Sequence, residues 1–364
     1  MEVKFPAMKG RMGKRDYFVT TMQMSAVPRM FSFDDWAGLA PEDREQRILS
    51  VKRVPEVAHY ILDNEDGYIF SSITASYKAD VDFVPANDEG TLGYVVLDIA
   101  DANFIINDGQ HRAAAIKEAL KDNPELGKDT ISVILFPYES KERVQQMFSD
   151  LNRFVKKTSK SLDILYDKRD RLSKVTLDAI ERIPVFKDMV DKDAVSLPIR
   201  SPKLFTLSAL YDANKELLKA FDKEDDDQLI DRAVDYWNTV AAAMPDWRKV
   251  QSGLVPSVQL RQERISSHST VMRAIGAAGG DLLQLPVAEW HDKVHEFESI
   301  DWGKKNKEWE NVCIIANSVV SNRQARLATK AYIKRKLGLS LSEGELRALD
   351  GDVIDDATLN EIAA

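Results

Sequence analysis

The order of strand and helix signals in the first half of the chain constrains its fold more than any other feature. Residues 93–99 (GYVVLDI) and 102–106 (ANFII) are rich in β-branched residues and predict two strands close enough to form a hairpin. Residues 110–120 (QHRAAAIKEAL) hold three consecutive alanines and predict a helix. Residues 130–138 (TISVILFPY) are almost continuously apolar, as in a central strand, and a helix follows at 141–154. This β-β-α-β-α order predicts a small α/β domain.

The rest of the chain has a different pattern. Residues 17–24 predict one further strand near the N-terminus. After Ser161 the apolar residues recur mainly at helical spacing. The segments concerned are 162–183, 204–221, 228–243, 271–278, 290–297, 309–320 and 323–337. We therefore expect an α+β protein with a small α/β domain at residues 1–160, a mainly α-helical domain at 161–340 and an acidic C-terminal tail at 341–364.

The composition is that of a globular protein. Hydrophobic residues make up 44 % of the chain, and no apolar run approaches the roughly 20 residues needed to span a bilayer. The N-terminus does not begin with a basic segment followed by an apolar one, so we expect no secretion signal. The single cysteine, Cys313, cannot form an internal disulfide and lies in an apolar run, which favours a core position. These features predict a cytoplasmic protein that does not enter a membrane.

The charge of the chain is unevenly distributed. The net charge is −9, and residues 339–364 carry seven acids against one base, which leaves only −3 for the other residues. Residues 141–174 hold ten bases against five acids, and residues 303–338 hold nine against two. An uneven charge distribution of this kind suits a protein that is acidic overall and contacts anionic partners through a few basic segments.

The segment 107–112 (NDGQHR) is the strongest candidate for a site. It joins a predicted strand to a helix start, where backbone N–H groups and the helix dipole favour an anion. Gly109 allows a positive φ, Arg112 can fork onto phosphate oxygens, and His111 can titrate near neutral pH. Asp108 could hold the turn, orient His111 or Arg112, or help to hold a metal. The alternative, weighed evenly from spacing alone, is that Asp108 only caps the helix and the other two are surface residues.

Two further groups of residues are candidates for phosphate or DNA contacts. The first follows the central strand and contains Asn152 and Arg153 with three lysines, Lys156, Lys157 and Lys160. Taken alone, this run is more typical of a solvated helix end. The second is the stripe formed by Arg323, Arg326, Lys330 and Lys334, whose spacing places them on one helix face. A basic face can contact DNA phosphates, and a solvated amphipathic helix is an equal alternative.

Other motifs are ambiguous or absent. The block 253–273 contains Arg261, Arg264, four consecutive polar residues (266–269) and Arg273, which fits an anion site or a seam between domains equally well. His291 and His295 have i, i+4 spacing, but the glutamate of a zinc-protease helix is missing, so we predict no metal site. The sequence also has no P-loop, no dinucleotide fingerprint and no nucleophile elbow.

Several of these segments resemble a known family. The run NDGQHRAAAI is similar to the hallmark of DGQHR-domain proteins, and FSDLNRFVKKTSKSLDILYD resembles the second block of that family. Later segments, RSPKLFTLSALYDANK and ISSHSTVMRAIGAAGGDL, are also similar. From about Tyr17 to Leu341 the chain resembles the DndB family of DNA phosphorothioate (sulfur) modification clusters. This resemblance implies a regulator, a transcriptional repressor that binds the promoter region of the modification genes, rather than the sulfur-transfer enzyme.

A more remote resemblance is to the ParB/sulfiredoxin-like fold, in which two boxes grip a nucleoside triphosphate. Gly109 and Arg112 match the first box, and Asn152 with Arg153 matches the second without its usual spacer. This resemblance implies an N-terminal domain of that fold and a nucleoside triphosphate, with Mg²⁺, as its cofactor. The implied phosphate-binding residues are Asp108, Gly109, Gln110, His111, Arg112, Asn152 and Arg153.

These features leave three functional hypotheses. The first is the DNA-binding repressor, with Lys156, Lys157, Lys160 and the 323–334 stripe on the DNA backbone; a two-fold homo-oligomer would suit a palindromic operator. The second is a nucleotide-dependent enzyme, an NTPase or a DNA-processing protein, with Asp108, His111 and Arg112 as candidate catalytic residues. The third is a scaffold for other proteins of the modification complex, which the acidic tail could serve.

Overall fold

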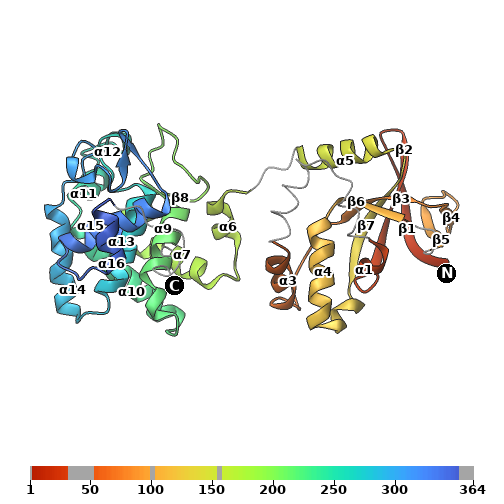
Figure 1. Cartoon of the computed structure of the whole chain (residues 1–364), viewed down its shortest axis with the longest axis horizontal. Helices are drawn as coiled ribbons and strands as arrows, with labels where there is room; N and C mark the ends of the chain where they lie inside the picture. Colours follow the sequence, from red (N-terminus) through yellow and green to blue (C-terminus); the bar gives the residue numbers. More distant parts are fainter. Residues whose placement is uncertain (1, 32–52, 99–102, 154–157, 352–364) are drawn as a thin grey trace. The chain divides into compact units, whose positions relative to one another are not determined.

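The computed structural model describes residues 2–31, 53–98, 103–153 and 158–351. The chain divides into two units, Met1–Lys156 (unit 1) and Lys157–Ala364 (unit 2), which are treated separately below (Figure 1). Unit 1 combines a sheet with helices, and unit 2 is mainly helical. The predicted mixture of α and β structure is therefore confirmed.

Unit 1 is built on a seven-stranded sheet with the order β4-β5-β1-β2-β7-β3-β6. The strands are β1 (Glu2–Met12), β2 (Arg15–Gln23), β3 (Ile73–Lys78), β4 (Asp82–Pro85), β5 (Leu92–Asp98), β6 (Asn103–Asp108) and β7 (Thr130–Pro137). Neighbouring strands are antiparallel except for β3 and β7, which are parallel. The apolar β7 has strands on both sides, as its composition predicted.

Helices cover both faces of this sheet. They are α1 (Val27–Met30), α3 (Val54–Leu62), α4 (Gln110–Asp122) and α5 (Lys141–Arg153), with a 3₁₀ turn η2 (Pro124–Lys128). Figure 1 shows α3 and α4 on one face of the sheet and α5 on the other. Helix α4 packs against both α3 and β3, and its small Ala113 and Ala115 are fully buried. The strands β1 and β5 carry exposed apolar side chains, including Met8, Leu92 and Tyr94.

The predicted hairpin between residues 93–99 and 102–106 is wrong. β5 pairs with β1 and β4, whereas β6 pairs with β3 at the opposite edge of the sheet. The strands β1, β2, β7 and β3 lie between β5 and β6. The N-terminal β1–β2 hairpin supplies the partner for β5, so β5 and β6 do not pair with each other.

Unit 2 is a bundle of helices connected by short segments. The helices are α6 (Lys160–Tyr166), α7 (Arg171–Arg182), α8 (Pro184–Lys187), α9 (Leu207–Leu217), α10 (Asp226–Ala242), α11 (Pro245–Gln251), α12 (Ser257–Glu263), α13 (Ser269–Leu282), α14 (Val287–Val294), α15 (Arg323–Lys336) and α16 (Glu343–Leu349). Three 3₁₀ turns, η3 (Lys219–Phe221), η4 (His295–Ser299) and η5 (Lys307–Trp309), and the short strands β8 (Val190–Asp191), β9 (Phe205–Thr206), β10 (Ile314–Ile315) and β11 (Ser318–Val319) complete it.

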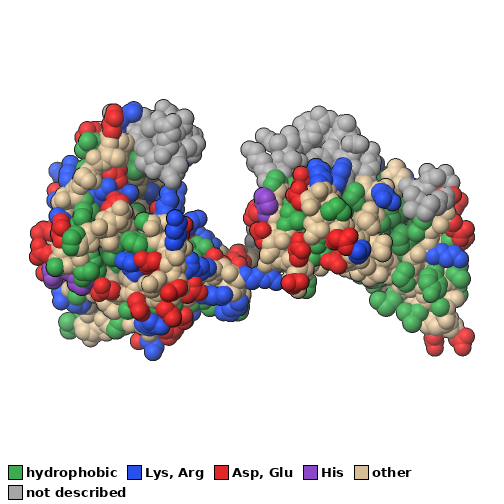
Figure 2. Space-filling view, turned by 90° about the horizontal axis from the view of Figure 1, so that it is seen from below, with side chains coloured by type: hydrophobic (Ala, Val, Ile, Leu, Met, Phe, Trp, Pro, Cys, Tyr) green, Lys and Arg blue, Asp and Glu red, His purple; other side chains and the backbone are tan. Residues whose placement is uncertain are grey.

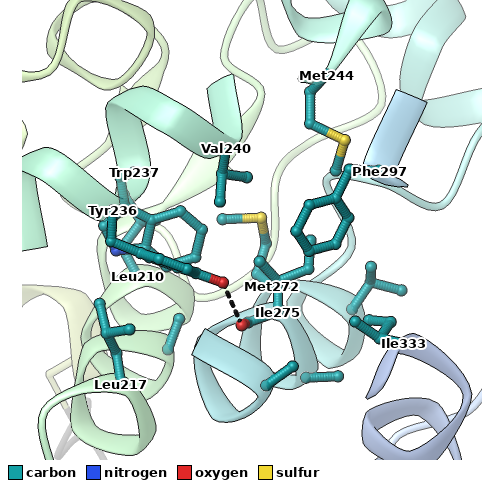
Figure 3. Packing of buried hydrophobic residues seen from close by; sticks show 14 of the residues in the cluster. Leu210, Leu217, Tyr236, Trp237, Val240, Met244, Met272, Ile275, Phe297 and Ile333 are labelled. Carbon is teal, nitrogen blue, oxygen red and sulfur yellow. Dashed lines mark hydrogen bonds between the residues drawn. The ribbon is translucent and has the colours of Figure 1, made fainter. Parts of the chain in front are cut away.

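Aromatic residues from several helices fill the core of unit 2 (Figure 3). Tyr236 is fully buried, and its hydroxyl donates a hydrogen bond of 2.7 Å to the carbonyl oxygen of Ile275. The indole Nε1 of Trp237 donates to Asn214 Oδ1 at 2.7 Å, so both polar atoms are satisfied inside the core. Cys313 is also fully buried, and burial raises the pKa of its thiol to about 11. Its predicted role as a core residue is confirmed.

Helices α9 and α13 pack unusually closely because small residues meet at their interface. A Cβ atom on Gly276 would lie 2.2 Å from the carbonyl oxygen of Ala213, and one on Gly280 would lie 3.3 Å from that of Leu217. Residue numbers rise together along this interface, so the two helices run parallel. Their N-termini, at Leu207 and Ser269, therefore lie at the same end of the pair.

Part of the predicted acidic tail is a packed helix. α16 (Glu343–Leu349) lies against α15, and its Glu345 and Ala348 side chains are buried. Ser342 caps α16 in a reciprocal capping box with Glu345. The remaining acidic residues from 352 onward lie outside the described residues.

Candidate phosphate-binding site

The strand β6 ends at Asp108, and the chain turns into α4 at Gly109. Gly109 is the N-cap of α4, with φ 99° and ψ 14°, a left-handed conformation that favours glycine. A Cβ atom here would lie 3.2 Å from the Cα of Ile73 on the neighbouring strand, so the turn also needs the absence of a side chain. No side chain caps the helix, so its first N–H groups lack a capping acceptor. The interpretation of Asp108 as a simple helix cap is wrong.

Asp108 instead holds Arg112. The guanidinium Nη2 of Arg112 donates to Asp108 Oδ2 at 2.6 Å, and the Arg112 side chain is only 17 % exposed. A Cβ on Gly109 would lie 3.0 Å from Nη2 and 3.2 Å from Nε of Arg112, so the guanidinium lies directly over the turn. An anion at the start of α4 would therefore meet both helix N–H groups and a positioned guanidinium.

The buried atoms Asn107 Oδ1 and Gln110 Oε1 at this turn lack a hydrogen-bond partner among the described residues. Asn107 is fully buried, and its Nδ2 donates to Ser76 Oγ at 2.8 Å. Because buried polar atoms normally have partners, such atoms mark a place where a ligand can supply them. Ser76 was not predicted from the sequence, since only the folded sheet brings it to the turn.

None of the contacts described for the second predicted group links it to this turn, although the helix that carries two of its residues touches it. Met147 of α5 lies against the motif, with its Sδ 4.0 Å from Asn107 Nδ2. Asn152 and Arg153 occupy the last turn of the same helix and are exposed, and the Asn152 amide donates to the Phe148 carbonyl oxygen at 2.8 Å. Lys156 and Lys157 lie outside the described residues. Lys160 begins α6 of unit 2 and forms an ion pair of 2.5 Å with Asp212.

The predicted basic stripe on α15 requires a correction. Lys334 is buried and contacts Glu345 Oε2 at 2.9 Å and Asp281 Oδ2 at 2.8 Å. Lys330 also pairs with Glu345, at 3.2 Å. Helix α16 covers this part of the face, so Lys334 cannot reach DNA without unfolding. Arg323 and Arg326, near the start of α15, are partly exposed.

Figure 2 draws one face of the molecule, on which Lys and Arg side chains of unit 2 are mixed with Asp and Glu. The described residues show no large continuous basic patch on that face. We therefore expect anion binding to depend on individually positioned cations such as Arg112 rather than on the overall charge of the surface.

The site fits the phosphate part of a nucleotide better than a metal held by protein alone. Among the residues that the structure describes, no group of three His, Cys, Asp or Glu side chains could hold a metal ion. Asp108 is engaged with Arg112, so a nucleotide's own phosphates would be the main ligands of Mg²⁺. His291, a weak metal candidate, lies 3.4 Å from Asp235 instead.

The described part of the chain has no helix long and apolar enough to cross a membrane. A search of curated proteins and a search of solved structures found no match. The family model for DndB, described as DNA-sulfur modification-associated, matches residues 5–340, which is nearly the whole chain. The chain therefore belongs to the DndB family and is associated with DNA sulfur modification.

Proposed function

We propose that this protein is a DNA-binding regulator that represses the genes of a DNA sulfur modification system. Family membership supports the link to sulfur modification. The turn at Asp108–Arg112 is the main support for a role in DNA binding. Here the N-terminus of α4 has no side-chain cap, and Asp108 holds the Arg112 guanidinium beside it. Both features suit a phosphate oxygen.

Phosphate binding at this turn uses groups that the protein leaves unused. Within the described residues, only Nη2 of Arg112 has a carboxylate partner, so its other N–H groups remain as donors. Asp108 holds the guanidinium in position before the ligand arrives, which lowers the entropy lost on binding. Contacts of this kind fix the register of a protein on DNA, whereas base contacts select the sequence.

The regulator role predicts preference for one DNA segment. We expect the full chain to bind a labelled duplex from its own upstream region about 1000-fold more tightly than a scrambled duplex of equal length. Fluorescence anisotropy across a salt series measures this, because affinity that rests on phosphate contacts falls steeply with salt. Equal and weak binding to both duplexes would contradict the repressor role.

A second candidate function is that of a nucleotide-dependent enzyme, which the buried unpartnered atoms of Asn107 and Gln110 favour. These atoms are too enclosed for a DNA backbone, whereas a small ligand could supply partners for them. Phosphate release from ATP or CTP with Mg²⁺ measures this activity. If the turn is catalytic, Arg112→Ala abolishes turnover and leaves salt-dependent DNA binding nearly intact; no release by the wild-type chain excludes the enzyme.

A further inference from the structure

Unit 2 contains a cavity of about 260 Å³ that is separate from the turn at Asp108–Arg112. The loop after β8, the starts of α9 and α13, and Arg261 of α12 surround it. Its lining combines apolar side chains, including Val195, Leu197 and Leu204, with the polar side chains of Arg261 and residues 267–269. The cavity can therefore contact both an anionic and an apolar part of a ligand.

The starts of two parallel helices converge on this cavity. Thr206 caps α9 through its hydroxyl, His268 caps α13 through its ring, and both residues line the cavity. The parallel packing of α9 and α13 leaves no opposed helix end to cancel their dipoles. Two positive helix ends therefore act on the same small volume.

Cations without acidic partners add to this positive potential. The Arg261 guanidinium donates only to carbonyl oxygens, including that of Ser201 at 2.7 Å, and Lys304 Nζ donates to the Arg261 carbonyl oxygen at 2.8 Å. No carboxylate of a described residue pairs with either group. Burial, and secondly the neighbouring Arg261 charge, lower the pKa of Lys304, as expected for cations gathered without a counter-charge. By contrast, Arg264 is neutralised by Asp301 at 2.8 Å.

Hydrogen-bond donors at the cavity also lack protein partners. Ser267 lines the cavity and is 8 % exposed, and its hydroxyl makes no hydrogen bond to a described residue. The Nδ1 atom of His268 accepts from the Thr270 N–H at 3.3 Å, so its Nε2 carries the proton and can donate. An oxyanion in the cavity would satisfy these donors.

We propose that this cavity binds a phosphate group, held by Arg261, Ser267, His268 and the starts of α9 and α13. The apolar wall at Val195, Leu197 and Leu204 would contact the organic part of a phosphate monoester. That chemistry is shared by a nucleoside monophosphate and by the 5′-phosphate end of a DNA strand. This site does not depend on the turn at Asp108–Arg112.

The direct test is thermal unfolding and calorimetric titration of the full chain with inorganic phosphate, against sodium chloride of equal ionic strength. The Arg112→Ala chain serves as the background, so that binding at the turn does not contribute. We expect phosphate to raise Tm and to bind with a Kd that Lys304→Gln weakens about tenfold. Lys305→Gln, an exposed neighbour with the same charge change, should leave the Kd unchanged.

Ser267→Asp provides a second test, because its carboxylate would occupy the place of the phosphate. We expect this variant to raise Tm by about 1–4 °C without phosphate and to lose the phosphate response. Ser267→Asn, which is neutral and of equal size, should retain the response. A Tm of the Arg112→Ala chain that phosphate does not raise above the chloride value would overturn the proposal, as would a phosphate response that Ser267→Asp retains in that background.

Two further titrations identify the source of the phosphate. Tighter binding of AMP than of adenosine assigns the cavity to nucleotides. Tighter binding of a 5′-phosphorylated single strand than of the same strand without its phosphate assigns it to DNA ends. In both cases Lys304→Gln should remove most of the difference.

Discussion

Replacing Lys334 with methionine is expected to lower the free energy of unfolding by about 3–5 kcal/mol. Lys334 and Glu345 are both buried, with Nζ 2.9 and 3.1 Å from the two carboxylate oxygens. Removing the lysine would leave the Glu345 carboxylate with only Lys330, at 3.2 Å, as a cationic partner. Truncating one side of a buried pair is costly because the remaining charge stays away from water.

Urea unfolding of the purified chain measures this loss. Lys336→Met is the matched control on the same helix, because its ion pair with Glu308 is partly exposed and should contribute less than about 1 kcal/mol. The double change Lys334→Met with Glu345→Met should recover much of the stability, since it leaves no buried charge without its partner. A loss from Lys334→Met no greater than that from Lys336→Met would show that the pair is not buried in solution.

The same pair sets a pH dependence of stability. Burial alone would raise the pKa of Glu345, but the hydrogen bond from Lys334 and the Ser342 N–H lower it below its usual range. The pair's contribution is therefore present above the unfolded-state pKa of about 4.3 and is lost as pH falls through the folded value. Lys334→Met should flatten this acid limb of the stability curve.

Gly276→Val is expected to cost about 3 kcal/mol or more, at the upper end of the range for overpacked cores. The added Cβ would lie 2.2 Å from the Ala213 carbonyl oxygen, which is backbone and cannot rotate away. The helices α9 and α13 would have to separate, and the core packing shown in Figure 3 would open.

Ala277→Val, on the partly exposed side of α13, is the control for the helix propensity of valine and should cost less than about 1 kcal/mol. Thermal or urea unfolding of both variants gives the comparison. Equal losses for Gly276→Val and Ala277→Val would mean that the two helices do not pack as closely as described.

The sequence predicted local structure better than long-range pairing. The strand, glycine turn and helix at residues 104–120 follow from local propensity, and the structure contains all three. The position of β5 does not follow from local propensity, because its partner β1 is distant in the sequence. Phe5 of β1, for example, pairs with Val95 of β5. β1 itself was not predicted, since its lysines and Pro6 hide the pattern of a strand.

The candidate site shows the same division. Gly109 and Arg112 were predicted from residue type and spacing, and the structure brings them together with Asp108. Helical spacing placed Lys330 and Lys334 on one face, but spacing cannot reveal what packs on that face. The covering helix α16 lies in the segment that was predicted as an acidic tail, and its Glu345 is buried against that face.

The central claim, that Arg112 contacts DNA phosphate at the start of α4, is tested most directly by the salt dependence of DNA binding. The measurement is the slope of log K against log salt concentration for the upstream duplex, with the wild-type chain, Arg112→Ala, and Lys121→Ala as the control at the far, exposed end of α4. We expect Arg112→Ala to weaken binding about 10- to 100-fold and to reduce the slope by about one, with Lys121→Ala close to wild type. An Arg112→Ala chain whose affinity and slope match the wild type would contradict this account.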